Sequence, residues 1–143
     1  MRSFASMLFV AGLACASGPV PVAQEPIDWR AVDDRRSLHI VTVDPDGDER
    51  VTRIWVAIVD GEGTLRTGGS RWWQNLERDP NCRIRLLGIE YPVRVEFVME
   101  HEEKARIDDA FVEKYGWLER ILFRQKRGET HENYARLHRG EVP

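Results

Sequence analysis

The segment that most constrains the fold is residues 65–80, LRTGGSRWWQNLERDP, in which a strand, a tight turn and a short helix follow one another. Two glycines, at positions 68 and 69, separate the strand from Ser70, a residue type that often caps the first turn of a helix. The apolar positions that follow are spaced for a helix over residues 71–78, and an Asp-Pro pair ends it. The chain must therefore join a strand to a helix across a two-glycine turn.

The same segment carries the groups that a phosphate requires. Around the turn, Arg66 and Arg71 supply positive charge, two hydroxyl side chains supply hydrogen bonds, and the glycines let backbone N–H groups approach an anion closely. The alternative interpretation is a tight turn followed by a helix cap, which needs no ligand. On the first interpretation the cofactor-binding candidates are Arg66, Thr67, Gly68, Gly69, Ser70, Arg71 and Trp73.

Tryptophan is frequent, with five residues in a chain of 143. Large aromatic side chains either fill a core or form the walls of a site for a flat ligand. Trp72 and Trp73 are adjacent in the expected helix, so their side chains point to different sides of it. We expect one of the pair in the core and the other at a cofactor wall or a dimer contact.

Length and charge limit the classes of partner. A chain of 143 residues accommodates one compact domain with a sizeable core, but not two ordinary domains. Lys and Arg number 21 and Asp and Glu number 24, so the net charge is −3 and no basic excess suggests a nucleic-acid partner. Beyond the N-terminal stretch no second long apolar run occurs, so we expect no membrane span.

The N-terminus has the features of a secretory signal. Arg2 supplies a positive start, residues 7–16 form a short apolar stretch, and Ala14-Cys15-Ala16 resembles a cleavage site. The expected division is a signal segment at 1–16, a linker at 17–27 and one domain at 28–143, with export to the periplasm or cell envelope. Two alternatives stay open: lipid attachment at Cys15, and a misassigned start codon, in which case the protein is cytoplasmic.

Most of the remaining sequence has a β-strand pattern. Residues 50–59 are rich in β-branched residues, and in residues 89–99 Val93, Val95 and Phe97 alternate with charged side chains. Asp-Gly-Glu-Gly at residues 60–63 predicts a hairpin turn. The expected strands are residues 38–43, 50–59, 64–67, 82–87 and 89–99.

Helical spacing appears outside residues 71–78 as well. The expected helices are residues 27–34, 101–115 and 119–127, with Gly116 as a cap or kink between the last two. Residues 133–139 suit either a helix or a closing strand. This order of elements predicts a mainly β domain with flanking helices, either a small β-barrel or another α+β arrangement.

Cysteine and histidine give no sign of a reactive or metal centre. Cys82 begins an alternating strand, so a buried core thiol is expected. Once the signal segment is removed, Cys82 alone remains and no disulfide forms within the chain. The histidines have no metal-ligand spacing, so we expect no metal; they are His39, His101, His131 and His138.

A set of residues, together with the element order, resembles a known family. These residues are Trp55, Arg66-Thr67-Gly68-Gly69, Trp73, Asn75-Leu76, Pro80 and Lys114-Tyr115-Gly116. The chain is similar over residues 29–139 to the split β-barrel flavin-binding proteins of the pyridoxamine-phosphate-oxidase-like superfamily. Within that superfamily the resemblance is to the deazaflavin-dependent nitroreductase branch and a related group of small proteins.

The resemblance implies an FMN-binding-like split β-barrel that forms a homodimer, with FMN or a deazaflavin at the interface. It places the cofactor phosphate on Arg66, Thr67, Ser70 and Arg71, where Arg71 stands in for a common lysine as a bidentate clamp. The implied activity is that of a flavin- or deazaflavin-dependent oxidoreductase with a small-molecule substrate. Two alternatives stay open: a non-catalytic binding or structural module that has lost the cofactor, and a haem or tetrapyrrole binder.

Overall fold

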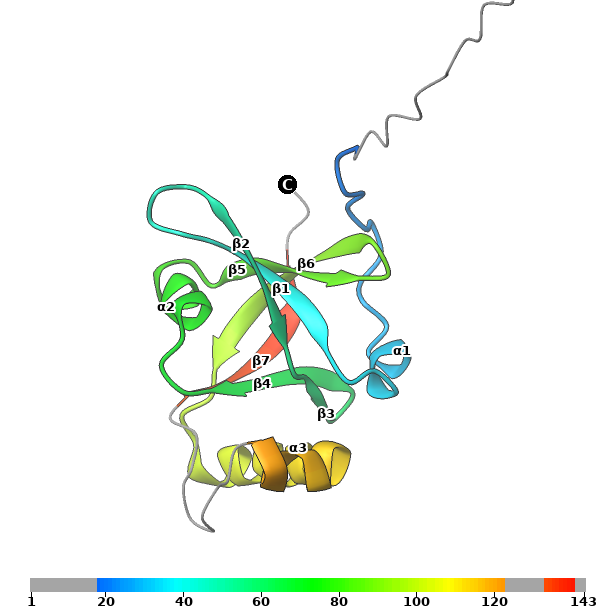
Figure 1. Cartoon of the computed structure of the whole chain (residues 1–143), viewed down its shortest axis with the longest axis vertical. Helices are drawn as coiled ribbons and strands as arrows, with labels where there is room; N and C mark the ends of the chain where they lie inside the picture. The colour runs from blue at the N-terminus through cyan, green and yellow to red at the C-terminus, as the bar shows by residue number, and fades with distance from the viewer. Residues whose placement is uncertain (1–17, 123–132, 141–143) are drawn as a thin grey trace, which may run out of the picture.

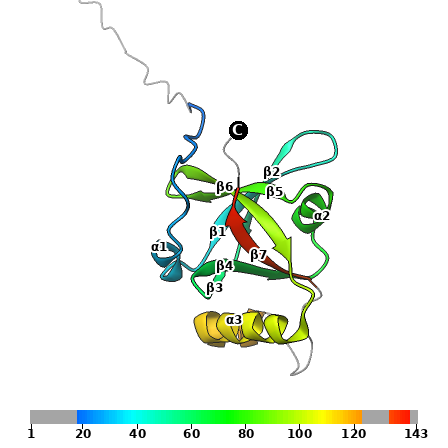
Figure 2. The same cartoon turned by 180° about the vertical axis from the view of Figure 1, so that it is seen from behind.

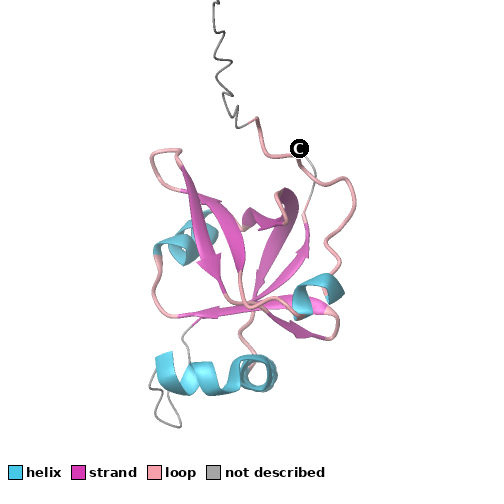
Figure 3. Ribbon diagram, turned by 45° about the vertical axis from the view of Figure 1, so that its right-hand side comes forward, coloured by secondary structure: helices cyan, strands magenta, loops and turns pink. Residues whose placement is uncertain are grey.

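The computed structural model describes residues 18–122 and 133–140, and in this part of the chain seven strands form one antiparallel sheet that curls into a split β-barrel (Figure 1). The strands are β1 (Leu38–Val43), β2 (Glu49–Ile54), β3 (Ala57–Val59), β4 (Glu62–Thr67), β5 (Asn81–Leu86), β6 (Ile89–Phe97) and β7 (Asn133–Arg139). The helices are α1 (Arg30–Asp33), α2 (Arg71–Arg78) and α3 (His101–Leu122). Figure 3 shows these helices outside the strands, so the expected fold class is confirmed.

The two edges of the sheet are consecutive in the sequence. The strands lie in the order β2-β1-β5-β6-β7-β4-β3, yet only Trp55 and Val56 separate the edge strands β2 and β3 along the chain. The sheet must therefore curl until its edges approach each other. The expectation of a single strand over residues 50–59 was wrong, since β2 ends at Ile54 and β3 begins at Ala57. The sequence carries no sign of this break, because the apolar run contains no turn residues where the chain passes from one edge of the sheet to the other.

The barrel interior holds one apolar cluster. Successive side chains of a strand point to opposite faces, so Leu65 of β4 and Leu137 of β7 point inward and are buried. Trp29, beside α1, packs against this cluster. A Cβ atom added at Gly63 would lie 2.6 Å from the Trp29 indole, so only glycine fits at this position without a shift of the ring.

A second apolar cluster lies outside the barrel, where α3 packs across β3 and β4 (Figure 2). It consists of Ala57, Val59, Val98, Ile107, Phe111, Tyr115 and Tyr134. The expected helix over residues 101–115 is confirmed. The helical span continues to Leu122 across a kink at Gly116, whose φ of 25° suits a residue without a Cβ atom. The rest of the expected helix over residues 119–127 lies outside the described residues.

The remaining expectations concern the ends of the domain. The helix expected over residues 27–34 is shorter, and residues 133–139 form the closing strand β7, which pairs with β4 and β6. Within the expected linker, Ala23 N donates to Glu90 O at 2.8 Å, so this stretch is hydrogen-bonded to β6. The expected signal segment and Cys15 lie outside the described residues. None of the helices among the described residues is both long and apolar enough to cross a bilayer.

Candidate functional site

Helix α2 lies beside β1 and separates two concave regions of the surface. It spans Arg71–Arg78 as expected, and its first residues follow the two-glycine turn. Asn75 faces the turn between β1 and β2, where it bonds to Asp44, whereas the Trp73 ring meets Phe97 at the end of β6. Each side of this helix therefore holds part of residues 65–80, with Arg71 on the first side and Trp73 on the second.

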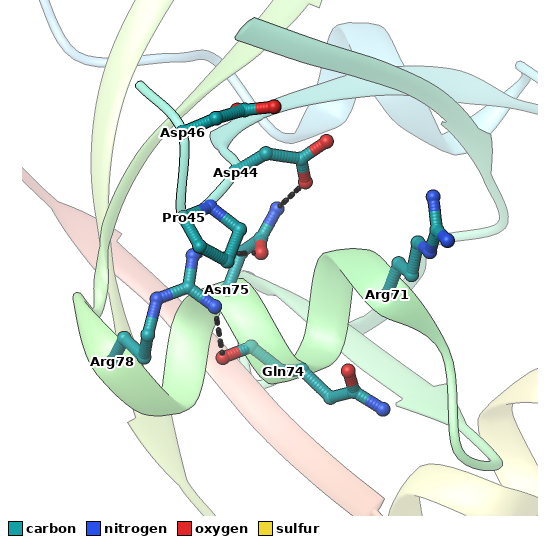
Figure 4. Close-up of a pocket in the computed structure, with 7 residues that line it drawn as sticks. All are labelled: Asp44, Pro45, Asp46, Arg71, Gln74, Asn75 and Arg78. Atoms are coloured by element: carbon teal, nitrogen blue, oxygen red, sulfur yellow. Dashed lines mark hydrogen bonds between the residues drawn. The ribbon is translucent and has the colours of Figure 1, made fainter. Parts of the chain in front are cut away.

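The polar pocket, on the first side, has a volume of about 310 Å³ (Figure 4). It is lined by Asp44, Pro45, Asp46, Arg71, Gln74, Asn75 and Arg78. The Asn75 amide donates to Asp44 Oδ1 at 2.7 Å and to Thr42 Oγ1 at 3.0 Å. Arg78 in turn donates to Asn75 Oδ1 at 2.9 Å. These bonds fasten α2 to β1 and to the turn after it.

Asp44 is the centre of this network. Arg50 donates to its two carboxylate oxygens at 2.8 and 2.6 Å. The hydrogen bonds from Arg50, and then the one from Asn75, lower the pKa of the Asp44 carboxyl from 3.8 to about 2. An ionised carboxylate that already accepts three hydrogen bonds serves the structure, and it is poorly suited to act as a free acid or base.

The aromatic groove, on the second side of α2, has a volume of about 390 Å³. It is lined by Trp73, Glu77, Phe97, Val98, Met99, Lys104, Asn133 and Tyr134. The groove lies where the two apolar clusters meet, because Trp73 belongs to the barrel cluster and Tyr134 to the α3 cluster. Phe97 stands edge-on to Trp73, with ring centroids 5.2 Å apart. Phe97 is 37% exposed and Met99 77% exposed, so apolar surface at the groove remains open to solvent.

Polar groups lie at the rim of this groove. Trp73 Nε1 donates to Glu77 Oε1 at 3.0 Å, and this bond, one turn along α2, fixes the orientation of the indole ring. On the α3 side the Lys104 ammonium lies 5.7 Å from the centroid of the Tyr134 ring. The Asn133 amide donates to Gly68 O at 3.3 Å, so the two-glycine turn borders the groove.

Arg66 and Arg71 face different surroundings. Arg66 and Thr67 are consecutive in β4, so their side chains point to opposite faces of the sheet. The Arg66 side chain is 4% exposed, forms an ion pair with Asp108 of α3 at 2.6 Å and lies 4.5 Å from the centroid of the Phe111 ring. Arg71 lines the polar pocket instead. The expected convergence of the two arginines on one pocket is not seen, and a cofactor role for either stays a prediction.

The turn before α2 differs from the expected cap. Ser70 occupies the N-cap position, but its side chain makes no capping hydrogen bond. The Thr67 hydroxyl donates to the Ser70 hydroxyl at 3.4 Å. A Cβ atom added at Gly68 or Gly69 would meet no atom within 4 Å, so the backbone of the turn is open to approach from outside.

Of the eight residues that line the groove, the sequence interpretation named only Trp73 as a site residue. Phe97 was assigned to the same strand face as Val93 and Val95, but it lies at the end of β6 and is half exposed. Tyr134 lies in the segment that suited either a helix or a strand, and Lys104 follows no local pattern. An aromatic residue at the end of an alternating strand was the one available signal.

The histidine, cysteine and acidic side chains of the described residues are the candidates for metal binding or nucleophilic chemistry. Among residues 18–122 and 133–140 no group of three His, Cys, Asp or Glu side chains is placed to hold a metal ion. Cys82 is buried, as expected, and this burial raises the pKa of its thiol to about 12. A thiol with so high a pKa is protonated at neutral pH and is a poor nucleophile.

Comparison with solved structures places the chain among split-barrel proteins. An FAD-binding protein from Mesorhizobium loti is similar with a TM-score of 0.59 and 12% identity, over 80% of this chain and 88% of that one. An F420-H2 dependent reductase has a TM-score of 0.55 and 12% identity, over 73% of this chain and 95% of the reductase. The haem storage protein HutZ from Vibrio cholerae has a TM-score of 0.54 and 15% identity, over 76% of this chain and 84% of HutZ.

The TM-scores establish a shared fold, and the names of these three proteins refer to different cofactors, namely FAD, F420-H2 and haem. A further similar structure is titled a domain-swapped dimer. Among curated proteins no sequence matches. A family model described as "Uncharacterized protein conserved in bacteria (DUF2255)" matches residues 28–134, which is most of the chain.

Proposed function

The chain belongs to the bacterial family DUF2255, whose description names no reaction, and we propose its function from the aromatic groove. The groove binds a flat redox cofactor of the flavin or deazaflavin type, and the protein acts as an oxidoreductase on a small molecule. The observation that carries this proposal is the convergence of Trp73, Phe97 and Tyr134 on one partly open groove. The FAD-binding and F420-H2 dependent proteins of the same fold support it.

The groove fits a flat ligand in size and chemistry. Its volume of about 390 Å³ lies within the range of about 300–1,000 Å³ for small-molecule sites. Trp73 and Tyr134 are buried and fixed by hydrogen bonds to Glu77 and Asp108, so the aromatic walls are preorganised. The open backbone at Gly68 and Gly69 borders the groove, where it leaves room for the edge of a ligand.

The cofactor would supply electron or hydride transfer, and the protein would supply position and electrostatics. Phe97 and Met99 would cover the exposed edge of the ring system and exclude water from it. Asn133 has amide groups at the rim for polar contacts with the ligand. None of these roles requires a catalytic acid–base pair, which agrees with the sequence, where no such pair stands out.

The proposal is tested by titrating the purified protein with FMN and with a deazaflavin and measuring the quenching of fluorescence. We expect saturable binding of one of the two. Phe97→Ala should weaken it about 5- to 30-fold, because loss of an aromatic contact costs about 1–2 kcal/mol. Met99→Ala should also weaken binding. Leu87→Ala is the control, because Leu87 is as exposed as Met99 but lies in the β5–β6 hairpin, and this variant should bind as the wild type does.

Other results would identify the alternatives. Protein that remains colourless and binds neither cofactor would contradict the proposal and favour a non-catalytic module. Haem is the second candidate, because the haem storage protein HutZ has the same fold. A Soret band on titration with haemin, lost in Phe97→Ala and kept in Leu87→Ala, would assign the groove to haem instead.

We further propose that the protein is a homodimer. The exposed Met99 at the groove is the kind of apolar surface that a second copy covers, and the domain-swapped dimer of this fold supports self-association. Light scattering coupled to size exclusion measures the mass directly. A mass equal to that of one chain at micromolar concentration would contradict this part of the proposal.

A further inference from the structure

The charges in the aromatic groove are arranged asymmetrically. Among its lining residues, Glu77 on α2 is the anion and Lys104 on α3 is the cation. Glu77 Oε1 accepts the hydrogen bond from the Trp73 indole. The Lys104 ammonium lies near the face of Tyr134 and forms no ion pair with any described residue. A ligand in the groove therefore meets the negative charge of Glu77 on one wall and, on the other, the positive charge of Lys104, which is not paired with a carboxylate of the described residues.

The two arginines expected to bind an anion are placed differently. Arg66 is buried under α3 and its charge is balanced by Asp108. Arg71 lines the polar pocket beside Asp44 and Asp46, whose carboxylates repel an approaching anion. Of these three cations, Lys104 is the one that lines the aromatic groove.

We propose, on the premise of the proposed function, that Lys104 selects aromatic ligands that carry an anionic group, such as a phosphate or carboxylate. Glu77 directs the same group away from α2 by repulsion. The preferred ligand is thus an anionic flat molecule, with its charged group toward the start of α3. For flavins this means that FMN binds more tightly than riboflavin, which differs by the terminal phosphate.

The measured quantity is the ratio of the riboflavin dissociation constant to the FMN dissociation constant. We expect a ratio of about five to ten in the wild type, the range for a partly exposed charge contact. Lys104→Gln should bring the ratio to one or below, because the repulsion from Glu77 remains, and Lys104→Arg should preserve it. Arg71→Gln is the matched control, because it removes one positive charge on the other side of α2, and it should leave the ratio unchanged.

Glu77→Gln separates electrostatics from structure. Glutamine keeps a carbonyl oxygen that accepts the hydrogen bond from Trp73, but it removes the negative charge. FMN binding should therefore become severalfold tighter while riboflavin binding stays the same. A purely structural role for Glu77 would change both affinities together. Higher salt should lower the ratio in the wild type and raise that of Lys104→Gln toward one, because salt screens both the attraction by Lys104 and the repulsion by Glu77.

A second pair of probes distinguishes this inference from the proposed function. The dye 8-anilinonaphthalene-1-sulfonate and neutral N-phenyl-1-naphthylamine differ by one sulfonate, and neither is a flavin. Binding of the anionic dye that depends on Lys104, without binding of flavins, would sustain the inference and overturn the proposed cofactor. If flavins bind but Lys104→Gln leaves the riboflavin-to-FMN ratio unchanged, the inference is overturned and the proposed cofactor stands. The same holds if Arg71→Gln brings that ratio to one. Failure of these four probes and of the deazaflavin to bind would overturn both.

Discussion

In the polar pocket Asp44 and Asn75 belong to one hydrogen-bonded network, whereas in the aromatic groove the apolar and charged groups at the rim remain available. Asp44 accepts hydrogen bonds from Arg50 and Asn75. Across α2, Phe97 is half exposed and Lys104 has no ion pair among the described residues. The same helix thus presents a structural network on one side and a candidate binding surface on the other. Substitutions in the first should change stability, and substitutions in the second should change ligand binding.

Asn75→Ala should give the largest effect on stability. Asn75 is 4% exposed and links Thr42, Asp44 and Arg78, so its removal leaves buried polar groups without partners. We expect a loss of about 2–3 kcal/mol in the free energy of unfolding, measured by urea denaturation. Glu77→Gln, on the exposed side of the same helix, should change stability by less than about 0.5 kcal/mol. Equal losses in the two variants would contradict the division into a structural and a binding side.

Gly63, in the barrel, and Gly68, beside the groove, differ in how much room they leave for a side chain. At Gly63 a new Cβ atom meets the Trp29 indole at 2.6 Å, whereas at Gly68 it meets nothing within 4 Å. Gly63→Ala should therefore cost about 1–3 kcal/mol of stability by overpacking, and Gly68→Ala close to none. Thermal melts of both variants measure the difference. If Gly68→Ala proves as destabilising as Gly63→Ala, the turn beside the groove is not open as described.

Local signals in the sequence predicted the elements better than the site. The bounds of α2 were predicted because the two-glycine turn and Pro80 lie next to the helix that they limit. The partner of Arg66 was not, because Asp108 is 42 residues away and comes close only when α3 packs on β4. The groove likewise joins Trp73 of α2 to side chains from three later parts of the chain. A charged residue in a strand can bind a ligand or a distant carboxylate, and the sequence pattern is the same in both cases.

Strong acid should weaken the polar pocket through Asp44. The pKa of the Asp44 carboxyl is lowered to about 2 in the folded protein by Arg50 and Asn75, from an ordinary value of 3.8. A lowered pKa means that the ionised form stabilises the fold above about pH 4, and that this contribution disappears as the pH falls toward 2. Asp44→Asn should remove that part of the pH dependence. Urea midpoints at pH 5, 4, 3 and 2 measure it, and parallel curves for the two proteins would refute the assignment.

The smallest effect is expected for Ser70→Ala, at the start of the helix between the two regions. A serine that caps a helix through its side chain contributes about 1 kcal/mol. Here the Ser70 side chain makes no capping bond, and its hydroxyl meets only the Thr67 hydroxyl at 3.4 Å. The loss of stability should stay below about 0.5 kcal/mol. Thr64→Val is the matched control, because that buried hydroxyl donates to Ala57 O at 2.9 Å and its removal should cost about 1 kcal/mol. A larger loss for Ser70→Ala than for Thr64→Val would show that Ser70 caps α2 in solution, and would return the turn to a purely structural role.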